Sequence, residues 1–277
     1  MKSCWIKIHL KLINYIMETV NQFAIIAIFF YILASFTKIY QITSKHLIFL
    51  FGGLAVTFHA LILQQSMITP TGLNLGFFSA ASMMAWVISM LLLLSILRQP
   101  VENLIIILFP IAALTIGLES YFTTERILST GNLGVTLHVL LSIIAYSLLT
   151  ISAIQALFLA LQNYHLRRKH PGWVLKKLPP LQIMESLLFQ MIGVGFIFLS
   201  MSLLSGIFFL QDIFDQHLVH KTILSIIAWC VFAILLWGHW HYGWRGKTVI
   251  RWTIGGFTVL MLAYFGSKMV LELILNR

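Results

Sequence analysis

Two histidines lie inside long apolar runs of the sequence, and they are the residues best suited to chemistry. His59 falls in the run 46–64 and His138 in the run 134–162. An ionisable side chain within a membrane-spanning segment is energetically costly and marks a functional candidate by default. A neutral imidazole on each of two facing helices, in an apolar cavity, suits a haem iron. His59 and His138 are therefore candidate ligands of a haem iron.

The simpler interpretation is that each histidine is a neutral imidazole, hydrogen-bonded between packed helices. Depth in the membrane favours ligation, because the helical rise places His59 roughly 20 Å above the inner end of its run and His138 about 6 Å below the outer end of its own. The two histidines then lie at nearly matching depth. No carboxylate is expected at that depth, which argues against a hard-metal site or a proton relay. We assign four acidic residues to solvated outer loops: Glu119, Glu125, Asp212 and Asp215.

His138 also begins a stripe of polar residues. His138, Ser142 and Tyr146 recur every four residues and drift only about 40° per step around a helix, so they share one face. Hydrogen bonding between helices is the simpler interpretation of Ser142 and Tyr146. Contact with a bound cofactor is the alternative.

The elements that position these residues are membrane-spanning helices. Apolar types make up 60% of the 277 residues and charged types 9%, whereas a soluble domain is about a quarter charged. This composition argues against a soluble globular fold and excludes intrinsic disorder. Because a span needs roughly 20 apolar residues, we predict an all-α, polytopic membrane bundle of about eight transmembrane helices. The expected spans are 22–42, 46–64, 77–97, 101–118, 134–162, 187–210, 220–240 and 249–271.

The basic residues predict the topology. The formal net charge is +10, and eleven Lys and Arg residues fall in the connections after the first, third, fifth and seventh spans, against two in the other three connections. Cytoplasmic loops are enriched in these residues, so we expect both termini outside. The charge then reflects contact with the lipid bilayer, and we expect no nucleic acid partner.

The first residues stand apart from the rest of the chain. Residues 1–16 lack the long apolar core and small-residue cleavage site of a signal peptide. Because Met17 starts a short lead into the first span, we hypothesise that translation begins there and that 1–16 is an extension. Residues 17–277 then form a single integral membrane domain.

Several motifs, in a fixed order, resemble the cytochrome c assembly family of integral membrane proteins (CcsA/CcmC/HemX-like), and most closely its bacterial inner-membrane YpjD-type branch. The match covers roughly 134–267 well and the first four spans more loosely. The motifs are His138–Tyr146, Pro179 to Leu181 with Glu185, Gly195 and Gly206, Lys221 through Ala228 and Trp229, Gly243–Lys247, and Ala263–Gly266.

The resemblance implies a protein of the bacterial inner membrane that holds or handles haem at the outer face, with His138 as a ligand. Its implied partners are other cytochrome c maturation components or an apocytochrome. The family's tryptophan-rich outer motif is absent, since residues 210–220 contain no Trp, and no histidine follows the last span. We therefore hypothesise that His59 supplies the second ligand, with His217 or His220 as the competing candidates.

The sequence shows no nucleophile–base pair, phosphate-binding glycine loop or metal-hydrolase spacing. We therefore expect a protein that binds and orients haem and is not an enzyme. The alternative is a small permease, or an accessory or scaffold subunit, that has kept the fold without haem. In a permease, the region around His59 and His138 would line a polar cavity.

Overall fold

The computed structural model describes residues 2–40, 45–69, 72–122, 127–128, 133–167, 178–209, 216–266 and 269. The side chains are described from residue 21 onward, except at 127, 128, 167 and 216–218. In this part of the chain, helix predominates. Eight of the described helices are long and apolar enough to cross a membrane, which confirms the predicted all-α polytopic class.

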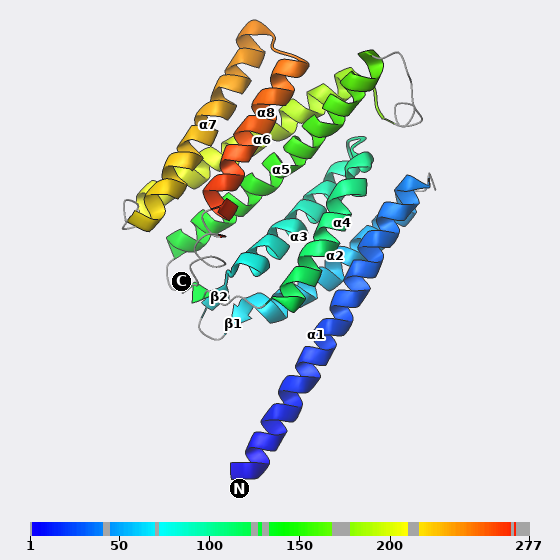
Figure 1. Cartoon of the computed structure of the whole chain (residues 1–277), viewed down its shortest axis with the longest axis vertical. Helices are drawn as coiled ribbons and strands as arrows, with labels where there is room; N and C mark the ends of the chain where they lie inside the picture. Colours follow the sequence, from blue (N-terminus) through cyan, green and yellow to red (C-terminus); the bar gives the residue numbers. More distant parts are fainter. Residues whose placement is uncertain are drawn as a thin grey trace. The chain divides into compact units, whose positions relative to one another are not determined.

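The chain divides into two compact units, which we describe separately. Unit 1 comprises residues 1–93 and 105–129, and unit 2 comprises residues 94–104 and 130–277. The helices of unit 1 are α1 (Lys2–Ile39), α2 (Lys45–Met67), most of α3 (Phe77–Ile96) and α4 (Ile105–Tyr121). Those of unit 2 are a short 3-10 turn (Glu102–Leu104), α5 (Leu133–Arg167), α6 (Leu181–Phe209), α7 (Gln216–Tyr242), α8 (Lys247–Met261) and a π-helical turn (Leu262–Gly266) (Figure 1).

Unit 1 is held together by close approach of its helices. α1 packs against both α2 and α4. Gly52 of α2 faces α3 and α4, since a Cβ atom built on it would lie 2.9 Å from Leu93 Cδ2 and 3.2 Å from Phe109 Cε2. The absence of a side chain at Gly52 thus lets these three helices meet.

A small antiparallel sheet closes one end of unit 1. Its strands, in the order β1-β2-β3, are β1 (Ile68–Thr69), β2 (Gly72–Asn74) and β3 (Ile127–Leu128). Leu73 of β2 is paired with Ile68 on one side and with Leu128 on the other. These strands are not predictable from the sequence, because two or three residues are too few to show an alternating pattern. The sheet follows the end of α2 and precedes α3.

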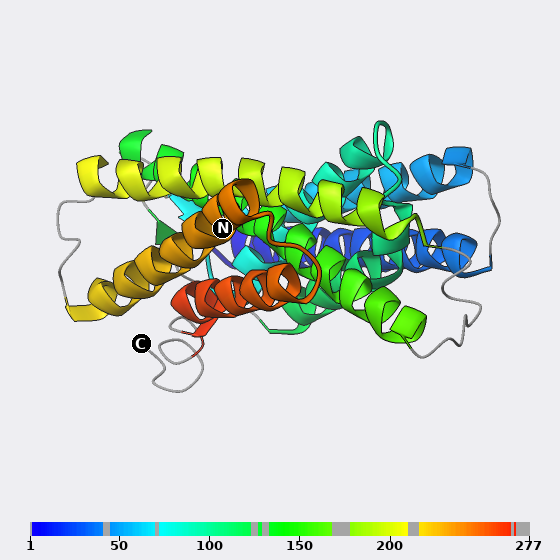
Figure 2. The same ribbon diagram turned by 90° about the horizontal axis from the view of Figure 1, so that it is seen from above.

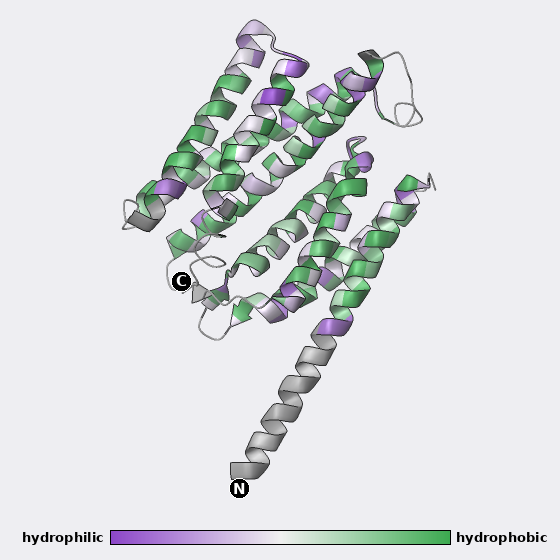
Figure 3. Cartoon of the chain, in the orientation of Figure 1, coloured by the Kyte–Doolittle hydropathy of each residue, from purple (hydrophilic) through white to green (hydrophobic). Residues whose placement is uncertain are grey.

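In unit 2, α5 packs along α6, and α8 packs against α5 and α7 (Figure 2). Apolar residues predominate along the helices, and hydrophilic ones gather near helix ends, as at the turn between α7 and α8 (Figure 3). Large apolar side chains are also exposed along the helices, among them Ile197 and Leu204 of α6. Such surfaces suit contact with lipid.

Candidate functional site

His138 is held by α6. Its Nδ1 atom lies 2.9 Å from the carbonyl oxygen of Ser202 and 3.1 Å from Ser205 Oγ. Because a carbonyl oxygen only accepts hydrogen bonds, Nδ1 carries the proton and donates it. In the neutral imidazole the lone pair is then on Nε2, which has no hydrogen-bond partner in the described part of the chain. In this tautomer Nε2 could bind a metal, as in metal-bound histidines whose other ring N–H is hydrogen-bonded.

The rest of the polar stripe forms hydrogen bonds between helices. Ser142 Oγ donates to the carbonyl oxygen of His138 at 2.7 Å and lies 2.7 Å from Ser202 Oγ of α6. Tyr146 is buried, and its hydroxyl donates to the carbonyl oxygen of Leu260 of α8 at 3.1 Å. Interhelical bonding, the simpler interpretation of Ser142 and Tyr146, is thus confirmed. Contact of either side chain with a cofactor stays a prediction.

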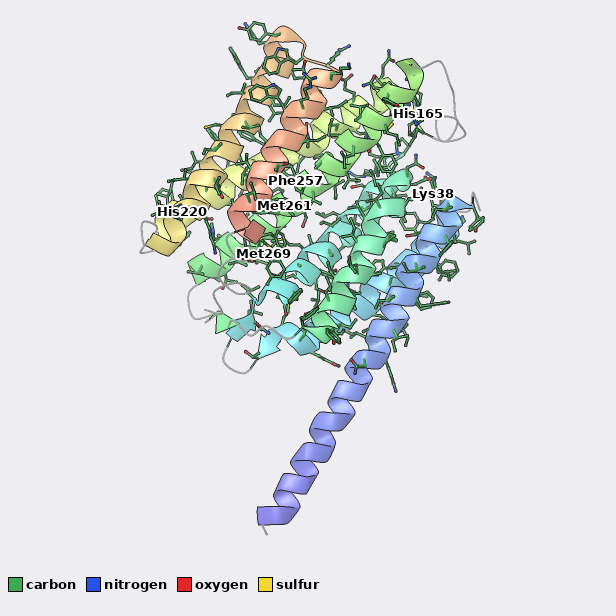
Figure 4. The ribbon with its side chains drawn as sticks, viewed as in Figure 1. Lys38, His165, His220, Phe257, Met261 and Met269 are labelled. Atoms are coloured by element: carbon green, nitrogen blue, oxygen red, sulfur yellow. The ribbon has the colours of Figure 1, made fainter. Side chains whose placement is uncertain are left out.

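His220 lies near the start of α7, at the end opposite the α7–α8 turn, and is exposed (Figure 4). Five residues further along α7, Ser225 lies beside the Tyr146 hydroxyl. We call the height of the Tyr146–Ser225 contact the Tyr146 level. From the helical rise, His220 lies about 7.5 Å before Ser225 along α7, and His138 lies about 12 Å before Tyr146 along α5. His138 and His220 are therefore on the same side of the Tyr146 level. The side chain of His217, the other competing candidate, lies outside the described residues.

His59 belongs to unit 1 and is completely buried. Its Nδ1 atom lies 3.1 Å from the hydroxyl oxygen of Tyr31 of α1, and its Nε2 atom lies 2.9 Å from Ser82 Oγ of α3. Both ring nitrogens are thus hydrogen-bonded to neighbouring helices. Iron ligation by His59 stays a prediction, and it would require one of these two bonds to break.

Glu119 is not a solvated loop residue, so that prediction is wrong. α4 continues to Tyr121, beyond the predicted end of the span at 118, and it carries Glu119 into the helix with only 7% of its surface exposed. Its Oε1 atom accepts a hydrogen bond from Ser66 Oγ of α2 at 2.8 Å. The hydropathy criterion ended the span at the acidic residue, although the helix does not end there. The three remaining acidic residues of the predicted outer loops lie outside the described residues: Glu125, Asp212 and Asp215.

The polar residues around Glu119 and His59 were not among the predicted site residues. A signal for them is present in α3, where Ser79, Ser82 and Ser89 recur at intervals of three and seven residues. These intervals place the three hydroxyls on one face of a helix. All three serines are buried.

The motif Gly243–Lys247 forms the turn between α7 and α8. Gly243 and Gly246 have φ angles of 65° and 60°, a left-handed conformation that favours glycine. The backbone N–H of Gly246 donates to Glu185 Oε1 at 2.7 Å, so the carboxylate of α6 satisfies a donor at the start of α8. His239 Nδ1 is bonded to the Trp244 carbonyl oxygen at 2.9 Å in the same turn. These hydrogen bonds and backbone angles give the turn a structural role.

The observations so far define a class of protein: an all-helical, multi-pass membrane protein with an imidazole oriented between two of its spans. Residues 47–275 match the family described as Cytochrome C assembly protein. The chain is 32% identical over 224 residues to the inner membrane protein YpjD of Escherichia coli (strain K12), covering 80% of this chain and 85% of that protein. The chain belongs to the cytochrome c assembly protein family.

A more distant similarity supports the same family. The chain is 30% identical over 140 residues to the cytochrome c biogenesis protein CcsA of Chlamydomonas reinhardtii, covering 49% of this chain and 38% of that protein. No solved structure matches the chain. The resemblance inferred from the motifs is therefore confirmed, and the chain is a multi-pass inner-membrane protein.

Proposed function

We propose that this chain binds haem in unit 2, with Nε2 of His138 as a ligand to the iron. The observation that carries the proposal is the hydrogen bond from His138 Nδ1 to the Ser202 carbonyl oxygen. It leaves the Nε2 lone pair without a partner among the described residues, which is the state in which an imidazole binds iron. Haem would supply an iron that accepts protein ligands and a macrocycle that needs apolar surroundings.

The residues around His138 fit such a group. The backbone acceptor on α6 fixes the plane of the ring and increases its basicity, as the outer-shell partners of metal-bound histidines do. Ser205 Oγ, 3.1 Å from the same nitrogen, restrains the ring further. Ser142 joins α5 to α6 at the next turn. The histidine is thus presented by a preorganised helix pair.

For the second ligand we favour His220, because it is exposed in the same unit and lies on the same side of the Tyr146 level as His138. The alternative is His59, the residue favoured by the sequence analysis. Ligation by His59 would leave either Tyr31 or Ser82 without its hydrogen bond. If His220 is the second ligand, His220→Ala removes low-spin haem. If His59 is the second ligand, His59→Ala does so.

In this proposal the protein binds and orients haem and does not turn over a substrate. The family match and the similarity to a cytochrome c biogenesis protein support a place in cytochrome c assembly. The partners would be other maturation components or an apocytochrome. The distribution of basic residues supports an outer-face location for the His138 end of α5.

The test is spectroscopic. We would purify the full chain in mild detergent and record reduced-minus-oxidised absorbance together with a pyridine haemochrome assay. We expect near-stoichiometric low-spin haem that is lost in His138→Ala and kept in His165→Ala, a matched control at the other end of α5 (Figure 4). Wild-type protein without haem, even after growth with excess haem precursor, would overturn the proposal in favour of a permease or scaffold.

The second ligand is assigned by two further variants. His220→Ala should convert the spectrum from low-spin to high-spin, while His59→Ala should leave it low-spin. The reverse pattern would assign the second ligand to His59.

A further inference from the structure

A polar cage lies inside unit 1, at the ends of three helices. We define it by four residues: Ser66 near the end of α2, Ser79 and Ser82 near the start of α3, and Glu119 near the end of α4. Ser66 Oγ donates to Glu119 Oε1 at 2.8 Å, and the hydroxyls of Ser79 and Ser82 also face the carboxyl group. One carboxyl group and three hydroxyls thus converge from three helices.

The carboxyl group of Glu119 is incompletely satisfied. Only 7% of the residue surface is exposed, and the Oε2 atom is buried without a hydrogen-bond partner among the described residues. No Lys or Arg of the described chain forms an ion pair with it. A buried carboxylate without a partner is strongly unfavourable, so the group must take up either a proton or a metal cation.

The donors indicate which kind of cation fits. Carboxylate and hydroxyl oxygens are hard ligands, which suit hard cations and not the thiolate- or imidazole-preferring metals. The described residues contain no group of three His, Cys, Asp or Glu side chains that could hold a metal ion. A single carboxylate carries one negative charge, so a monovalent ion gives a neutral site, whereas a divalent ion would leave an uncompensated charge in a low-dielectric interior.

We propose that the Ser66–Ser79–Ser82–Glu119 cage is a sodium-ion site. A proton on Oε2 would neutralise the carboxyl group alone, whereas Na⁺ would also use the hydroxyl oxygens that converge on it. Ser82 is fixed on the far side by His59, whose Nε2 atom lies 2.9 Å from Ser82 Oγ. His59 in turn contacts the Tyr31 hydroxyl at 3.1 Å. The two buried rings thus position a ligand of the ion.

The cage lies near the ends of the three helices that form it. Ser66 is one residue before the end of α2, Ser79 two residues after the start of α3 and Glu119 two residues before the end of α4. All three lie within one turn of a helix terminus, at the end of unit 1 that carries the β1-β2-β3 sheet. A bound Na⁺ would join α2, α3 and α4 at that end.

The test is a cation-dependent thermal shift on the full chain in detergent, at constant ionic strength, with Na⁺ replaced in turn by K⁺ or choline. We expect a saturable rise of the unfolding temperature with Na⁺ and a much smaller one with K⁺. Glu119→Gln, which keeps the shape of the side chain, should abolish the rise. Ser79→Ala should weaken the apparent Na⁺ affinity by about tenfold, equivalent to the loss of one ligand worth about 1.4 kcal/mol.

Ser120→Ala is the matched control, because Ser120 follows Glu119 on α4 but its hydroxyl donates to the Ile116 carbonyl oxygen. It should leave the Na⁺ response unchanged. Direct binding of radioactive Na⁺ to wild type and Ser79→Ala keeps the proposal testable if Glu119→Gln does not fold. Equal effects of Na⁺, K⁺ and choline, or an unchanged Na⁺ response in folded Glu119→Gln, would overturn the sodium site.

Discussion

The Nδ1 atom of His138 on α5 and the carbonyl oxygen of Ser202 on α6 are 2.9 Å apart, which fixes both the plane and the tautomer of this imidazole. The acceptor is a backbone atom. Substitution of the Ser202 side chain therefore leaves the bond in place, whereas the second contact, to Ser205 Oγ, depends on a side chain.

This difference predicts the effects of two serine substitutions. Ser205→Ala removes a restraint on the His138 ring and should weaken haem binding by about tenfold, the lower limit for loss of an outer-shell partner. Ser200→Ala on the same helix is the control, because Ser200 Oγ is bonded to the Phe196 carbonyl oxygen and to Trp229 Nε1, away from His138. Titration of the purified apoprotein with haem, followed by absorbance, measures both affinities. Equal affinities of the two variants would contradict the role of Ser205.

The glycine pair of α2 gives a test of packing in unit 1. Gly52→Ala should destabilise the protein by about 1–3 kcal/mol, because its new Cβ atom would press on Leu93 and Phe109. Gly53→Ala, one residue away, meets nothing within 4 Å and should be neutral or stabilising by up to about 1 kcal/mol through helix propensity. Thermal unfolding of both variants in the same detergent measures the difference. Similar unfolding temperatures would show that α2 does not pack as described.

Tyr31→Phe tests the contact between α1 and α2. It removes the hydroxyl that lies 3.1 Å from His59 Nδ1 and leaves a buried ring nitrogen without a partner, at a cost of about 1–3 kcal/mol. Tyr40→Phe is the matched control, because Tyr40 is 72% exposed. The unfolding temperature should fall in Tyr31→Phe only. Equal stability of the two variants would mean that the contact contributes nothing measurable.

Glu185 offers a test of the start of α8. Its carboxylate accepts the Gly246 N–H at 2.7 Å and lies at the positive end of that helix. Glu185→Ala should destabilise the protein by about 1–3 kcal/mol because the partly buried N–H of Gly246 loses a charged acceptor, and Glu185→Gln, which keeps an acceptor oxygen, should lose less. Chemical or thermal unfolding of the two variants ranks them. A larger loss in Glu185→Gln would refute the cap.

The helices were predictable because hydropathy alone identifies a span. The predicted run 77–97 differs by one residue at its end from α3 (Phe77–Ile96), and the run 134–162 lies within α5 (Leu133–Arg167). The shared face of His138, Ser142 and Tyr146 followed from helical periodicity, and all three bond to neighbouring helices.

Other features depend on contacts between helices that the sequence places far apart. The surroundings of Glu119 come from hydroxyls of α2 and α3 that lie 53, 40 and 37 residues earlier in the chain, and no local sequence pattern predicts that these helices pack together. The occupation of both nitrogens of His59 is a property of three helices together. The location of both termini outside, the start at Met17 and the haem ligands themselves stay predictions.

The cap on α8 has a consequence for how the chain is made. Glu185 leaves the ribosome 61 residues before Gly246, the residue that donates to it. During synthesis the carboxylate of Glu185 lacks this hydrogen-bond donor until residue 246 has been made. A polypeptide that stops before residue 246 never supplies it. The cap that joins α6 to the start of α8 therefore forms late in synthesis, after α7 is complete.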